Sequence, residues 1–235
     1  MKITCLTILS LLSMTGFAQG DKKWHTGNMT TIQGAGISFL QFNGLNSRIA
    51  AFPQYKTLRD YMGTISLGSR NVKKQFISEF TVTGASSMSG NRNKRSSNIR
   101  SLGVQLNLGY DLIPTEKIML YPMAGIGVTG FQAKFYKDNS AVNFNDVLGS
   151  SIVQNSIRGV KFTNSFVTYN LGLGFNFKPA KCDGSIGLQG SYTGSFSSRA
   201  WKGGDRQELA NAPADRLNSF QFSLVFTNMM NGYKK

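Results

Sequence analysis

Apolar and polar residues alternate along several stretches of the chain, as expected for β-strands that are apolar on one face and polar on the other. The clearest stretch runs from Ser219 to Thr227 and reads SFQFSLVFT. Residues 101–112 and 167–177 alternate in the same way. Helices repeat every ~3.6 residues, so they do not fit this pattern. The alternation therefore predicts an all-β chain.

The composition agrees with this prediction. Only 16% of the residues are charged, whereas an ordinary soluble domain has about 25%. Glycine is abundant, with 26 residues among 235, and Phe and Tyr account for most of the aromatic residues. This balance argues against a disordered chain, a coiled coil or a helical bundle.

Eight strands are predicted, and the connections between them alternate between long and short. This is the loop pattern of an up-and-down transmembrane β-barrel, with long external loops and short periplasmic turns. Pro122 is expected to mark a bulge or the start of pairing. The predicted strands are 31–42, 61–70, 75–83, 101–112, 119–135, 167–177, 185–195 and 219–227. The long connections are 43–60, 84–98, 136–165 and 196–218, and the short ones are 71–74, 113–117 and 178–184.

The first residues have the layout of a secretory signal peptide. A basic Lys2 precedes an apolar run, and small residues precede a cleavage point before Gln19. We expect residues 1–18 to be removed, leaving 19–235 as a single β-barrel domain outside the cytoplasm. Removal of Cys5 leaves Cys182 without a partner for a disulfide, and no CxxC spacing indicates zinc or redox chemistry. Export also argues against nucleic acid as a partner, despite the net charge of +15.

Two features suggest that the apolar faces point outward to lipid. The clear strands are about ten residues long, which suits a tilted crossing of a bilayer. Their polar faces carry small uncharged residues rather than the many charges of a water-facing surface. Eight strands enclose an interior that side chains just fill, so we expect a plugged lumen rather than an open channel. The alternative is a soluble secreted or periplasmic β-barrel that binds an apolar ligand.

Three segments with this pattern, 102–111 (LGVQLNLGYD), 121–128 (YPMAGIGV) and 170–177 (NLGLGFNF), resemble strands of small Gram-negative outer-membrane β-barrels. The resemblance is to the porin-like, OmpA/OmpX-type eight-stranded family. It covers the mature chain but involves pattern and turn spacing rather than a signature motif. It implies a non-enzymatic protein of the outer membrane with an envelope-structural, surface-interaction or membrane-assembly role. Family members often end on an aromatic residue, whereas here nine residues follow Phe226.

The sequence offers no arrangement for catalysis, metal binding or a cofactor. His25 is the only histidine and precedes the first strand, so we expect it in a solvated tail. Cys182 lies in a turn with no histidine near it in sequence. Glu79 and Asp111 could form an acid–base pair, but a carboxylate in a barrel is more often held by hydrogen bonds or ion pairs.

A polar network is instead expected inside the lumen. A turn at 71–74 would place Glu79 opposite Ser66, so that Glu79 would have to reach Gln105 or Arg70 for a partner. We also expect Leu106, Leu171 and Phe222 to face lipid. The expected lumen residues are Arg70, Glu79, Gln105, Asn107, Asn170, Gln189 and Gln221.

The partners follow from this location. They are outer-membrane lipid and, through a basic external loop, the phosphates of lipopolysaccharide. A merely solvated loop explains the same residues, which are Arg92, Lys94, Arg95 and Arg100. The chain is expected to be a monomer. Residues 43–61, which include Leu45, Ile49, Leu58 and Tyr61, are expected to hold a short helix over the barrel mouth.

Overall fold

The computed structural model describes residues 28–229 except 92–93, 114, 116 and 179–183. The expected signal peptide, Cys5, His25, Arg92 and Cys182 lie outside the described residues. The signal peptide and the single domain at 19–235 therefore remain predictions.

The chain forms a closed antiparallel barrel of eight strands, which confirms the predicted fold class. Each strand pairs with the next, and the last pairs with the first, so no long strand edge is left open. The long strands are β1 (Asn28–Leu40), β2 (Tyr61–Lys73), β3 (Phe76–Asn91), β4 (Lys94–Tyr110), β5 (Ile118–Phe135), β6 (Val160–Phe177), β7 (Gly184–Ser195) and β11 (Asn218–Met229).

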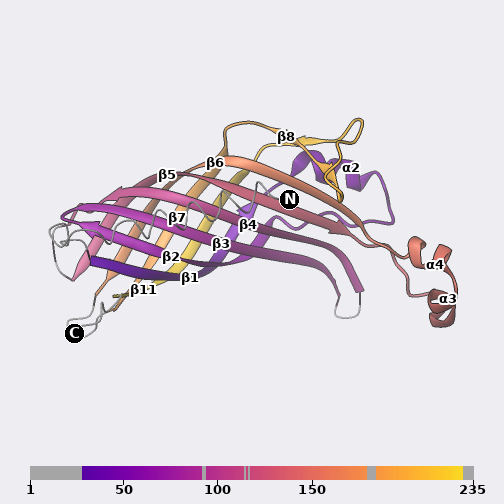
Figure 1. Cartoon of the computed structure of the whole chain (residues 1–235), viewed down its shortest axis with the longest axis horizontal. Coiled ribbons are helices and arrows are strands. Elements are labelled where there is room, and N and C mark those ends of the chain that lie inside the picture. The colour runs from indigo at the N-terminus through magenta and orange to yellow at the C-terminus, as the bar shows by residue number, and fades with distance from the viewer. Residues whose placement is uncertain (1–27, 92–93, 114, 116, 179–183, 230–235) are drawn as a thin grey trace, which may run out of the picture.

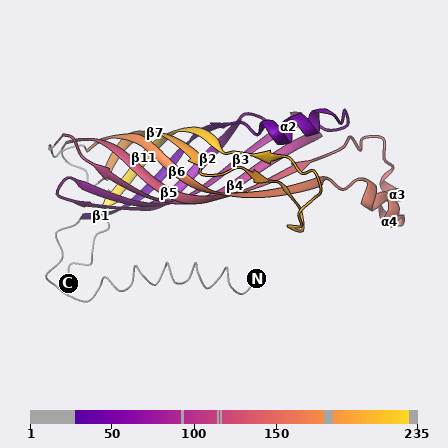
Figure 2. The same cartoon turned by 90° about the horizontal axis from the view of Figure 1, so that it is seen from above.

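The two ends of the barrel differ, as Figures 1 and 2 show. The connections β2–β3, β4–β5 and β6–β7 lie at one end, here called the turn end. The opposite end, the loop end, carries helix α2 (Asn43–Ala50) and the short strands of the last loop, with α3 (Phe144–Gly149) and α4 (Ser151–Ser156) projecting farthest. The short strands are β8 (Arg199–Ala200), β9 (Lys202–Gly203) and β10 (Ala214–Asp215). In the described part of the chain, no helix is both long and apolar enough to cross a membrane.

Large apolar side chains cover the outside of the barrel. Leu106, Leu171 and Phe222 are 51%, 54% and 60% exposed, while their sequence neighbours Asn170 and Gln221 turn inward. The same alternation continues around the wall, so the exposed side chains form a continuous apolar belt. The belt comprises Ile37, Phe39, Ile65, Leu67, Phe76, Phe80, Leu102, Val104, Leu106, Leu108, Ile126, Val128, Val167, Leu171, Leu173, Phe175, Ile186, Leu188, Phe220, Phe222, Leu224 and Phe226.

Several strands extend farther toward the loop end than the sequence pattern predicts. Residues 84–98, expected as an external loop, continue β3 and β4 as a hairpin, and β6 begins at Val160 rather than at residue 167. The prediction failed there because both faces of the extended hairpin carry polar residues once it leaves the belt. Backbone pairing holds these segments together without any apolar alternation to reveal them.

The β2–β3 turn is also shorter than predicted. Lys73 pairs with Phe76, so the turn contains only Lys74 and Gln75, and Lys74 adopts a φ of 58°. Two-residue hairpin turns need such left-handed residues because the turn must match the twist of the strands. The shorter turn shifts the register and places Arg70, rather than Ser66, directly opposite Glu79.

Pro122 has the role expected of it. It pairs with Leu173 on one side, but the pairing of β5 with β4 begins only at Met123. Since proline has no N–H to donate, it lies where the β4 ladder starts.

Candidate functional site

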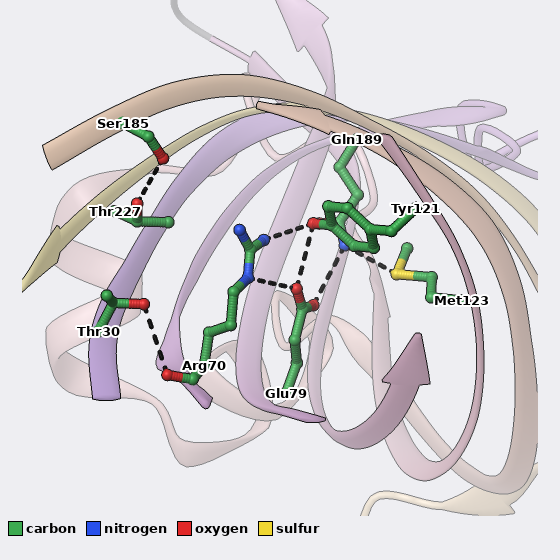
Figure 3. Close-up of polar contacts among 8 residues, drawn as sticks. All are labelled: Thr30, Arg70, Glu79, Tyr121, Met123, Ser185, Gln189 and Thr227. Carbon is green, nitrogen blue, oxygen red and sulfur yellow. Dashed lines mark hydrogen bonds and ion pairs between the residues drawn. The ribbon is translucent and has the colours of Figure 1, made fainter. Parts of the chain in front are cut away.

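A buried ion pair lies in the turn-end half of the lumen (Figure 3). The Arg70 Nε donates to Glu79 Oε1 at 2.6 Å, and both side chains are almost completely buried. The two residues face each other on β2 and β3 because Lys74 and Gln75 make a two-residue turn. Successive residues of a strand point to opposite faces. Even-numbered residues of β2 and odd-numbered residues of β3 point inward, so Arg70 and Glu79 both face the lumen, whereas Leu67 and Phe80 belong to the belt.

Tyr121 completes this cluster from β5. Its hydroxyl accepts a hydrogen bond from Arg70 Nη2 and lies 3.1 Å from Glu79 Oε1, as a donor to the carboxylate. The guanidinium carbon also lies 4.9 Å from the centre of the Tyr121 ring. The ring has room because Gly174 faces it from β6, where any Cβ would collide with the ring.

Two amides satisfy the remaining groups. Gln189 Nε2 donates to Glu79 Oε2 at 3.4 Å and approaches the sulfur of Met123 at 3.0 Å (Figure 3). When its side-chain amide is oriented with the oxygen toward Arg70, Asn176 accepts a hydrogen bond from Arg70 Nη1. The charges of Arg70 and Glu79 therefore cancel, and most of their hydrogen-bonding groups are paired. A buried ion pair needs this pairing to offset its desolvation.

Farther toward the loop end the lumen is polar and narrow. Asn170 donates to Asn107 at 3.1 Å and accepts from Thr193 at 3.2 Å, joining three strands across the interior. Gln105 and Gln221 line a neighbouring cavity of about 50 Å³, which has room for no more than a few water molecules. Gln105, one of the two expected partners of Glu79, lies here rather than in a hydrogen bond with that carboxylate.

An apolar plug fills the loop-end part of the barrel. This was not anticipated by the predicted polar lumen. Phe42 packs against Phe131 and Trp201 with ring centres 5.1 and 5.2 Å apart, in edge-on geometry. Helix α2 contributes Leu45 and Ile49, as expected for a helix over the mouth. The buried members of the plug are Leu40, Phe42, Leu45, Ile49, Leu58, Met62, Ile99, Phe131, Ala133, Phe135, Phe166, Trp201 and Leu217. Tyr61, the last residue of the segment expected to hold that helix, is instead exposed at the start of β2.

Asp215 ties the plug to the last loop. Its carboxylate accepts from the backbone N–H of Gly44 at 2.7 Å and of Leu45 at 3.0 Å, at the start of α2. It also accepts from the indole N–H of Trp201 at 2.7 Å. One buried carboxylate therefore holds together the first and last loops, which are far apart in sequence but lie at the same end of the barrel (Figure 1).

Replacing Asp215 with alanine should loosen this closure. Three N–H groups, two of them buried, would lose their acceptor, and each unsatisfied buried group costs about 1–3 kcal/mol unless water reaches it. In a Trp24→Phe background, we expect faster hydrogen exchange at Gly44 and Leu45 and a red-shifted Trp201 emission, with the eight long strands intact. Asp205→Ala in the same loop, where the carboxylate accepts from the nearby Gln207 N–H, is the control and should change neither signal.

The two carboxylates considered for acid–base chemistry have separate structural roles. Asp111 accepts from the N–H groups of Ile113 and Leu120 and so shapes the β4–β5 turn. Glu79 is enclosed by Arg70 and Tyr121. The described residues contain no group of three His, Cys, Asp or Glu that could hold a metal ion.

Three of the basic residues expected to contact lipopolysaccharide belong to β4. Lys94 and Arg95 belong to the backbone of β4, at the tip of the extended hairpin. Arg100 lies farther down β4 and is exposed.

Comparison with solved structures shows which known proteins have a similar fold. No protein-family model and no curated protein sequence matches the chain. The structure resembles Ail, the attachment invasion locus protein of Yersinia pestis, solved in complex with the heparin analogue sucrose octasulfate (TM-score 0.50, 14% identity, 86% of this chain and 97% of that one). It resembles Neisserial surface protein A to the same extent (TM-score 0.50, 7% identity, 88% of this chain and 100% of that one). The chain has the fold of a small outer-membrane β-barrel.

A third solved structure extends the comparison. A major outer membrane protein from Thermus thermophilus matches with a TM-score of 0.50 and 10% identity, over 86% of this barrel and 100% of that one. At these identities the likeness concerns the fold alone. It supports the expected outer-membrane location and does not favour the soluble alternative.

Sequence reasoning missed several residues of these interior contacts, among them Tyr121, Asn176, Trp201 and Asp215. Tyr121 and Asn176 lie on the inward faces of β5 and β6, and strand parity could have identified both. Trp201 and Asp215 lie in a long loop without alternation. A tryptophan in a segment that is otherwise mostly polar was the only sign of that contact.

Proposed function

We propose that this protein is a non-enzymatic barrel of the outer membrane with a closed lumen and a role in contacts at the cell surface. The observation that carries the proposal is the inverted polarity of the wall. Apolar side chains cover the outside, while the ion pair and the asparagine cluster lie inside. A soluble barrel would bury its apolar faces, whereas a barrel in lipid exposes them.

Cell fractionation tests the location. We expect the chain to sediment with the outer membrane and to run on a gel at a different mobility when it has not been boiled. Release as a soluble protein from the periplasm, with one mobility under both conditions, would favour the apolar-ligand carrier instead.

Three successive obstructions support a closed lumen. The Arg70–Glu79–Tyr121 cluster occupies the turn-end half, the Asn107–Asn170–Thr193 contacts join the strands beyond it, and the apolar plug fills the loop end. The cavity between them is too small for a hydrated ion to cross. Eight-stranded barrels have interiors of about this width, which side chains fill.

Planar-bilayer recordings test the closure. We expect the purified barrel to show conductance far below that of a 16-stranded porin, because no continuous water column crosses the interior. A steady, large conductance in most insertions would contradict a closed lumen. A parallel recording of Asp215→Ala indicates whether the plug or the deeper ion pair closes the path.

Among the expected roles, the loop end favours surface interaction. Helices α3 and α4 project beyond the barrel (Figures 1 and 2) and expose Phe144, Leu148 and Ile152. Replacing these three with serine leaves the barrel and its plug untouched. We expect cells carrying the triple variant to adhere less to apolar surfaces at equal amounts of folded barrel, and unchanged adhesion would argue against this role.

A further inference from the structure

Three basic side chains lie close together on the outer wall, on the loop-end side of the apolar belt. They are Arg100 on β4, Lys134 on β5 and Lys161 on β6, which are adjacent strands. Their outward direction follows from parity, since Ala133 and Phe135 are fully buried. This cationic strip, defined as Arg100, Lys134 and Lys161, differs from the basic segment 92–100 that the sequence suggested, because two of its members come from other strands.

The strand register brings the three charges close together. Lys134 pairs directly with Lys161, and Asn98 is the β4 partner of Lys134. Side chains opposite each other on antiparallel strands have Cβ atoms about 4.5–5.5 Å apart, and diagonal neighbours lie about 7–8 Å apart. Arg100 pairs with Gln132, which makes it the diagonal neighbour of Lys134. Like charges in this arrangement repel each other and destabilise the sheet.

No carboxylate relieves this repulsion within the described part of the chain. The ion pairs Arg70–Glu79 and Lys202–Glu208 do not include a member of the strip. Lys161 is only partly exposed and lies beneath Gly204 of the last loop. Three adjacent cations without a counter-charge form a site that an anion with several oxygens would stabilise.

The position of the strip selects the anion. On β4, Arg100 is the next outward residue after Leu102, which belongs to the belt. The strip therefore begins at the edge of the belt with Arg100, and it extends toward the loop end with Lys134 and Lys161, which are the third outward residues beyond Val128 and Val167. The loop end faces the cell exterior in barrels of this type. Anionic head groups of the outer leaflet lie at this depth, with their acyl chains alongside the belt.

We propose that the cationic strip binds the phosphate groups of a lipid A-type glycolipid in the outer leaflet. The inference rests on the proposed outer-membrane location. Lys134 and Lys161 would bind one phosphate between them, while Arg100 would approach it from the belt side with its planar donors.

Thermal unfolding in detergent tests this site. The purified barrel is refolded in zwitterionic micelles, and its melting temperature is followed while bis-phosphorylated lipid A is added. Lipid A should raise the melting temperature, whereas dephosphorylated lipid A and inorganic phosphate should not. Lys134→Gln/Lys161→Gln should need about tenfold more lipid A for half of the shift. Without lipid A, this variant should be at least as stable as the wild type because the repulsion is gone.

A matched control has Lys74→Gln/Lys117→Gln at the turn end, where both residues are exposed, and it should respond like the wild type. An unchanged response of the Lys134/Lys161 variant, or no shift in the wild type, would overturn the site. An equal shift with inorganic phosphate would overturn the assignment to a lipid. A barrel that folds with heat-modifiable mobility but fails these tests leaves the proposed function standing.

Discussion

Replacing Glu79 with alanine should destabilise the folded barrel by about 3–5 kcal/mol, because the change leaves the Arg70 guanidinium buried without a counter-charge. The same change removes the acceptor for Tyr121 and Gln189. Urea unfolding in lipid vesicles, followed by the loss of the fast-migrating unboiled form on gels, measures this difference. A loss below about 1 kcal/mol, typical of exposed pairs, would mean that water reaches the pair.

Two further variants separate charge from packing. Arg70→Met/Glu79→Leu removes both charges and keeps most of the volume, so it should be much closer to the wild type than either single variant. Glu208→Ala breaks the exposed ion pair with Lys202 and should have a far smaller effect. If the double variant is as unstable as Glu79→Ala alone, the cluster stabilises the barrel through its hydrogen bonds rather than through charge balance.

Arginine in place of Leu106 should cost about 2–4 kcal/mol if this position lies near the middle of the bilayer. Leu106 belongs to the belt on β4 and points away from the lumen. The measurement is the same unfolding experiment in vesicles. Leu112→Arg is the control, since Leu112 is exposed just after the turn-end terminus of β4 and an arginine near the interface costs about 0–1 kcal/mol. Equal costs at the two positions would contradict the assigned depth.

The sequence was sufficient to predict the wall of the barrel. Alternation is unbroken in 101–112 and 167–177, and only the buried Val225 departs from it in 219–227. Sequence parity therefore determines the direction of each side chain. Helix α2 was also predictable, from Leu45 and Ile49 in a long connection. The extended hairpin of β3 and β4 was not, because both of its faces carry polar residues beyond the apolar belt.

The details of the site depended on information that alternation does not contain. A turn of two residues rather than four leaves every side chain on its predicted face, yet it exchanges the partner of Glu79 from Ser66 to Arg70. The predicted direction of the side chains was therefore correct and the predicted register was wrong, while Arg70, one of the two expected partners of Glu79, does contact it. The Trp201–Asp215 contact joins loops that are far apart in sequence, and only the closed barrel brings them together.

Quenching by brominated lipid tests the outward apolar belt most directly. In a Trp24→Phe background, Leu171→Trp places an indole on the belt, while the native Trp201 is enclosed in the plug and serves as an internal reference. In vesicles of lipid brominated at mid-chain, the signal added by the new tryptophan should be blue-shifted and strongly quenched, with Trp201 little affected. An added signal that is insensitive to brominated lipid but quenched by aqueous iodide would show that this face meets water, and would contradict the account.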